Sequence, residues 1–124
     1  MDRLVTLSWL ALAAIHVTPA MVLFRPALTQ RLYAVPPSGD VGLLLIHRGA
    51  LFLAVLAATL VAAVHLPSRR LATIVVAISM LPFLWLYVRG GSPPGLRTIF
   101  VADLIGLVPL AVVVWNAWRP AVNP

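Results

Sequence analysis

Four apolar segments, each long enough to cross a lipid bilayer, constrain the fold of this chain more than any other feature. They cover residues 4–24, 41–64, 71–88 and 98–118. A helix rises about 1.5 Å per residue, so about twenty apolar residues span the hydrocarbon core. The polar–apolar alternation of a membrane β-barrel is absent, and within lipid only a helix then satisfies the backbone internally. The segments therefore predict an all-α protein with four transmembrane helices.

The connections predict that these helices form one antiparallel up-down bundle spanning residues 1–124. Residues 66–70 make a tight turn, and residues 89–97 form a loop rich in glycine and proline that no helix would tolerate. The first connection, residues 25–40, is longer and mixes apolar with polar residues, which predicts a short helix lying in the membrane interface. Aromatic residues are expected to mark both interfaces, with Trp9, Trp115 and Trp118 near one face and Trp85 and Tyr87 near the other.

Composition agrees with a membrane protein. Hydrophobic residues make up 62% of the chain and charged residues only 10%, whereas about a quarter of a soluble domain is charged. The net charge is +6, but the arginines occur in ones and twos at the ends of apolar segments. That placement suits phospholipid head groups and argues against nucleic-acid binding. The absence of cysteine excludes disulfides, thiolate metal sites and thiol catalysis.

Four ionisable residues within the predicted helices are candidates for a polar site: His16, His47, Arg48 and Asp103. Counted from one membrane face, the two histidines and Asp103 lie within about 5 Å of one another in depth. Small residues share their helix faces, so we expect all three to point into the bundle. For His47 the expected inner face carries Ala50, Ala54, Ala57 and Ala58. Arg48 projects about 100° away from His47 and is expected to meet Asp103 from an adjacent helix.

Further residues are expected to contribute to this layer. Prolines within three of the segments each free a backbone carbonyl, and Pro19 does so beside His16, which makes it a candidate ligand-binding residue. Tyr33 is a second such candidate, as a lid over the polar layer or as an interfacial anchor. Ser79 and Thr59 are expected to hydrogen-bond to the backbone of their own helices.

These residues predict a membrane-embedded site for a lipophilic small molecule, such as a quinone, an isoprenoid or a sterol-like compound. His16 or His47 would exchange protons, Asp103 would orient a histidine or act as a base, and Arg48 would hold an oxygen. The alternative is a structural Arg48–Asp103 ion pair in an accessory or assembly subunit of a larger membrane complex, or in a homo-oligomer. Whether the site is catalytic stays open.

Three other interpretations use the same residues. His16 and His47 at matched depth would suit the two axial ligands of haem b. Two histidines and Asp103 form a known metal-ligand set, although only their depth supports it. A small transporter is the last alternative; the length is similar to that of the small multidrug-resistance proteins, but the chain has no Glu for their first helix.

The spacing of these motifs resembles a family of small four-helix bacterial membrane proteins of unassigned function, near the broad DoxX-like grouping. The matching residues are His16-x-x-Pro19, Leu32-Tyr33, His47-Arg48-Gly49-x-Leu51-Phe52 and Asp103-Leu104, and they cover about residues 12–112. Some such proteins are labelled phosphopantetheine adenylyltransferase, which this chain contradicts because it lacks a nucleotide-binding α/β fold and a His-x-Gly-His motif. The resemblance implies a multi-pass protein of the bacterial inner membrane. The arginine count is equal on the two sides and leaves the orientation open.

Overall fold

Helices make up almost the whole of residues 2–120, the part of the chain that the computed structural model describes. The long helices are α1 (Asp2–Met21), α3 (Gly39–Val64), α4 (Arg69–Arg89) and α5 (Arg97–Trp118). A short helix, α2 (Leu28–Tyr33), lies in the first connection, and the 3₁₀ turns η1 (Leu66–Ser68) and η2 (Pro94–Leu96) precede α4 and α5. No strand occurs within these residues. The prediction of an all-α fold is confirmed.

The four long helices are, by length and composition, able to cross a membrane. Three of them match the predicted segments closely, but α1 ends at Met21 rather than at residue 24. Residues 22–24 instead form turns in which each N–H donates to the carbonyl three residues earlier. Pro26 disfavours helical backbone at Arg25, the residue before it, so the helix does not resume in these turns.

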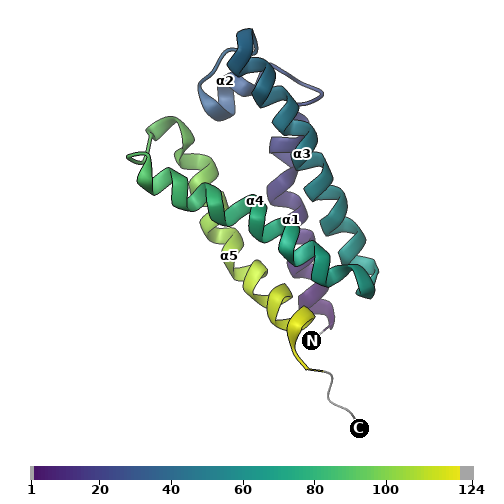
Figure 1. The fold of residues 1–124 in the computed structure, drawn as a ribbon. Coiled ribbons are helices and arrows are strands. Elements are labelled where there is room, and N and C mark those ends of the chain that lie inside the picture. Colours follow the sequence, from purple (N-terminus) through teal and green to yellow (C-terminus); the bar gives the residue numbers. More distant parts are fainter. Residues whose placement is uncertain (1, 121–124) are drawn as a thin grey trace.

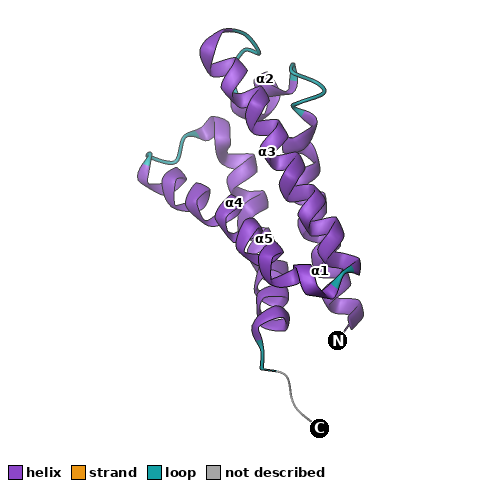
Figure 2. Ribbon diagram, turned by 45° about the vertical axis from the view of Figure 1, so that its right-hand side comes forward, coloured by secondary structure: helices purple, strands orange, loops and turns teal. Residues whose placement is uncertain are grey.

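α1 packs most extensively against α3 and also against α5, while α4 packs against both α5 and α3. Figure 1 shows that the first and last helices bring both chain ends to the same end of the molecule, while α2 lies at the other end. Figure 2 shows the α4–α5 pair leaning away from the α1–α3 pair toward the end that carries α2. The separation of the two pairs positions the site described below.

Close contact between α1 and α3 depends on Gly49. A Cβ atom added there would lie 2.7 Å from the backbone nitrogen of Leu23, just after the end of α1. Only glycine allows two backbones to approach so closely, as small residues do between other membrane helices. Gly49 is therefore the residue that sets which side of α3 faces α1.

The aromatic residues only partly follow the predicted interfacial pattern. Trp85, Trp115 and Trp118 are exposed, as expected for interfacial side chains. The expectation for Trp9 is wrong, because its side chain is fully buried in the packed core. Tyr87 is also buried, and its ring stacks on Phe100 with centroids 4.2 Å apart. Both rings bury large apolar areas between helices, which outweighs the pull of the interface on their polar atoms.

Arginines tie helix ends together at the end of the molecule that carries the termini. Arg69 donates to the carbonyls of Ala62 and Ala63, at 3.0 and 3.5 Å, and to Asn116 Oδ1 at 3.3 Å. Arg70 donates to the carbonyl of Ala117 at 3.0 Å. These carbonyls belong to the last turns of α3 and α5, where helical partners are missing and positive charge is favourable.

Candidate functional site

Side chains from three helices meet in one cavity. His16 of α1, Arg48 of α3 and Asp103 of α5 line a space of about 260 Å³, which we call the chamber. His16 and Asp103 are buried, at 2% and 8% exposure. The remaining lining residues are mostly apolar: Ala14, Ile15, Thr18, Pro19, Leu32, Phe52, Thr98, Ile99 and Ala102. The structure thus gathers three of the four candidate ionisable residues, together with Pro19.

His16 is held by both of its ring nitrogens. Nδ1 lies 2.8 Å from the carbonyl oxygen of Leu12, and Nε2 lies 3.1 Å from Ser79 Oγ on α4. A carbonyl only accepts hydrogen bonds, so Nδ1 carries the proton. In the neutral ring Nε2 is then an acceptor and Ser79 donates to it. The expectation that Ser79 bonds to its own helix is therefore wrong, whereas Thr59 does so, to the Leu56 carbonyl at 2.7 Å.

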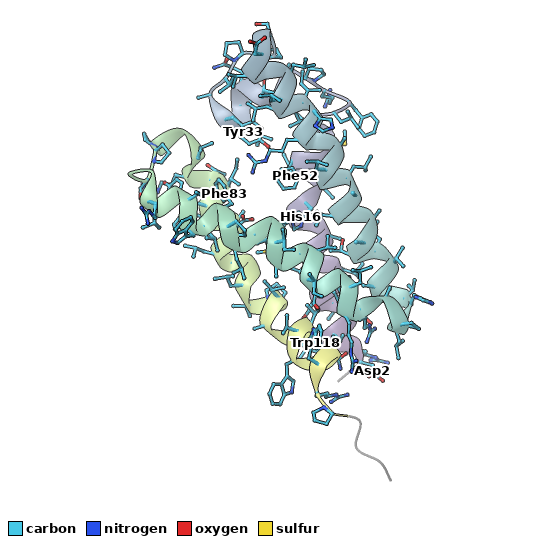
Figure 3. The ribbon with its side chains drawn as sticks, viewed as in Figure 1. Asp2, His16, Tyr33, Phe52, Phe83 and Trp118 are labelled. Carbon is cyan, nitrogen blue, oxygen red and sulfur yellow. The ribbon has the colours of Figure 1, made fainter. Side chains whose placement is uncertain are left out.

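Arg48 is surrounded by aromatic rings. Its guanidinium carbon lies 5.0 Å from the ring centre of Phe52, 5.7 Å from that of Tyr33 and 5.8 Å from that of Phe83. Figure 3 shows these three rings and His16 around the opening between the helix pairs. Cation–π contacts of this kind stabilise a charge without a counter-ion. Phe83 could not be predicted, since nothing in one sequence indicates which apolar residue contacts a charge on another helix.

The expected Arg48–Asp103 pair is not a direct contact. Both side chains line the chamber. Within residues 2–120, no side-chain hydrogen bond joins them, and none involves the guanidinium of Arg48 or the carboxyl group of Asp103. The guanidinium contacts rings on α2, α3 and α4 instead. A structural ion pair therefore does not account for these two charges.

The expected orientation of His47 is wrong. Its side chain is exposed and does not line the chamber, and Ala54 and Ala57 on its presumed inner face are exposed as well. Successive helix residues are about 100° apart, so His47 lies about 200° from Gly49, on the side of α3 away from α1. Arg48, next to Gly49, occupies the inward position. Alanine is tolerated on both lipid-facing and packed surfaces and was a poor guide to the inner face.

Because α3 faces α1 with Gly49 and not with His47, the side chains that would have to bind haem or a metal ion together lie apart. His47 is outside the bundle, while both nitrogens of His16 bond to Leu12 and Ser79. Within residues 2–120, no three His, Cys, Asp or Glu side chains gather closely enough to hold a metal ion. The geometry provides neither the His16–His47 haem ligand pair nor the His16–His47–Asp103 metal set.

Tyr33 covers the aromatic side of the site. It is the last residue of α2 and is 7% exposed. Burial raises the pKa of its phenol above the usual 10.0, an effect that the charge of Arg48 partly opposes. The next residue, Ala34, adopts a left-handed backbone with φ of 56° and ends the helix. Tyr33 is therefore a buried neighbour of Arg48, and it does not line the chamber itself.

Comparisons with protein-family models, curated proteins and solved structures find no match to this chain. Its chemistry must therefore be inferred from the side chains. The chamber combines a guanidinium, a carboxylate and a hydrogen-bonded imidazole within mostly apolar walls. Such a set can bind a polar oxygen and move a proton.

Proposed function

We propose that the chain is a multi-pass protein of a bacterial inner membrane, with α1, α3, α4 and α5 crossing in alternating directions and α2 at the membrane surface. The length and composition of the four helices support the crossings. The short connection through η1 and the position of both chain ends at one end of the molecule support the alternation. The chamber then lies within the membrane, toward the side opposite the termini.

The proposed function is to bind or transform a lipophilic small molecule with an oxygen-bearing head, of the quinone, isoprenoid or sterol-like class. One observation carries this proposal: Arg48 borders a cavity inside the bundle, and its N–H groups form none of the side-chain hydrogen bonds within residues 2–120. Charged residues within a membrane are costly and usually serve a ligand or an ion. A bound oxygen would accept these hydrogen bonds.

The other two groups suit proton transfer at that oxygen. Asp103 has no hydrogen-bond partner among the described side chains and faces the same cavity, so it can accept or deliver a proton. His16 keeps its proton on Nδ1, and its Nε2 accepts the hydrogen bond that Ser79 donates. Arg48 would stabilise negative charge that develops on the head, an effect that is strong where water is excluded.

The test compares an inward histidine with an outward one in the full chain, purified in mild detergent. A panel of a decyl-tailed benzoquinone, an isoprenoid alcohol and a sterol is titrated against the wild type and its variants. At least one compound should bind the wild type and His47→Ala equally. The same compound should bind Arg48→Gln, Asp103→Asn and His16→Ala about tenfold more weakly or worse, a loss of about 1.4 kcal/mol.

Two outcomes contradict the proposal. One is that no panel member binds the wild type. The other is that His47→Ala weakens binding as much as His16→Ala does, which would place the ligand outside the chamber. Circular dichroism and the elution volume of each variant establish that the helices still assemble.

A further inference from the structure

A second cavity lies beside the chamber, between α3 and α4. It has a volume of about 350 Å³, and we call it the α3–α4 groove. Arg48 and Phe52 line both spaces. The other groove residues are Leu51, Val55, Val75, Ile78 and Ser79. The hydrogen bond from Ser79 to His16 also connects the two cavities, since Ser79 lines the groove and His16 the chamber.

The groove is polar at one end and apolar at the other. Arg48 lies nine residues into α3 from the end near α2, and Ser79 lies ten residues before the end of α4 on that side. Val55 and Val75 lie farther toward the termini. The seven residues from Arg48 to Val55 correspond to a groove about 10 Å long. Its polar end is also the end that adjoins the chamber.

The groove opens to the outside of the bundle. Leu51 and Ile78, one on each wall, are 58% and 66% exposed. In a membrane their exposed faces meet lipid chains. Figure 2 shows that α4 diverges from α3 toward the end with α2, where the polar end of the groove lies. A molecule dissolved in the bilayer can therefore reach Arg48 from the side.

We infer that the groove holds the hydrocarbon chain of a quinone-type lipid whose head lies in the chamber; the inference rests on the proposed function. The two cavities lie between different helices and share Arg48 and Phe52 in their linings, so an occupant of both would bend beside these two side chains. A flexible chain attached to a flat head meets that requirement, whereas a rigid sterol skeleton does not. The direction from Arg48 to Val55 runs from polar to apolar, as does a head-and-tail lipid.

The experiment measures how much the tail contributes to affinity. A decyl-tailed benzoquinone and the same quinone without the tail are titrated against the full chain at a fixed detergent concentration. The tailed quinone partitions into detergent to the same extent in every titration. The ratio of the two quinone affinities is therefore compared between the wild type and the variants. Val75→Trp fills the groove, and Ile78→Trp fills it from a more exposed position. Val61→Trp is the matched control, since Val61 lines another cavity along the same helices, which shares only Val75 with the groove.

The tailed quinone should lose about tenfold or more in affinity for Val75→Trp and Ile78→Trp, while the tail-less quinone binds as it does to the wild type. Val61→Trp should change neither affinity. The groove inference is overturned if the two groove variants lower the affinity for both quinones equally, or lower neither affinity. The groove inference is also overturned if the wild type binds both quinones with the same affinity, but the proposed function then still stands. If neither quinone binds, the groove inference is refuted, and the isoprenoid and sterol arms of the panel decide the proposed function.

Discussion

Replacing Gly49 with alanine tests the contact that orients α3. The added methyl group would lie 2.7 Å from the backbone nitrogen of Leu23 and 3.4 Å from its Cα and Cβ atoms. Backbone atoms cannot rotate out of the way as a side-chain tip can. The two chain segments must therefore separate, and Arg48 and Phe52 on α3 move with the separation.

The magnitude follows from two opposing effects. Overpacking of this kind costs about 1–3 kcal/mol. Alanine is a better helix former than glycine by about 1 kcal/mol, which offsets part of that cost. We expect Gly49→Ala to lower the free energy of unfolding by up to about 2 kcal/mol.

Gly106→Ala is the matched control, since Gly106 also lies inside a long helix. There the added methyl would meet Met80 Cε at 2.6 Å and Ile15 Cδ1 at 2.8 Å, both flexible side-chain ends. Rotamer changes relieve such contacts, so the free energy of unfolding should change by less than about 1 kcal/mol.

Unfolding is followed by tryptophan fluorescence as dodecyl sulfate is added to mixed micelles, because Trp9 is fully buried and reports on the core. The gain in helix propensity is common to both variants, so the reasoning is refuted if Gly106→Ala loses as much stability as Gly49→Ala or more.

Two other predictions concern residues away from the α1–α3 contact. Arg69→Gln removes hydrogen bonds to two carbonyls of α3 and to Asn116, and should lower the free energy of unfolding by about 1–3 kcal/mol in the same micelle assay. Arg3→Gln, at an exposed position, should lower it much less, and equal losses would contradict the bridging role. Because burial raises the pKa of Tyr33 above 10.0, the folded protein favours the neutral phenol, and that stabilisation is lost as the pH rises past this value. The unfolding midpoint should fall less steeply above pH 10 for Tyr33→Phe than for the wild type; parallel curves would show that Tyr33 has no part in the loss.

The helices could be predicted from the sequence because lipid imposes one requirement along the whole chain. Any segment that crosses it must be apolar and about twenty residues long, and hydropathy records both properties. That His16 and Asp103 line one cavity could also be predicted, because residue counts from the helix ends give the depth of each side chain in the membrane directly. Neither inference required knowing how a helix is rotated about its axis.

Helix rotation was the information that the sequence withheld. In a soluble helix the polar side marks the exterior, but apolar residues occupy every side of a membrane helix. The choice between His47 and Arg48 as the inward residue therefore depended on which small residue faces α1. Alanines suggested one side of α3, and Gly49 determines another, because a Cβ atom at Gly49 would meet the backbone of Leu23 just after α1. The burial of Trp9 was missed for a related reason, since tryptophan suits both an interface and a packed core.

The orientation set by Gly49 explains why a charge can be kept inside the bundle. Pairing Arg48 directly with Asp103 would bury two charges that neutralise each other and leave little for a ligand. The rings of Tyr33, Phe52 and Phe83 stabilise the guanidinium through their faces, and a ring does not replace the acceptors that its N–H groups require. The arrangement holds the charge in place and leaves its hydrogen-bonding capacity for a group that enters the cavity. The same position borders the α3–α4 groove, so a molecule arriving from the bilayer meets Arg48 before it reaches His16 or Asp103.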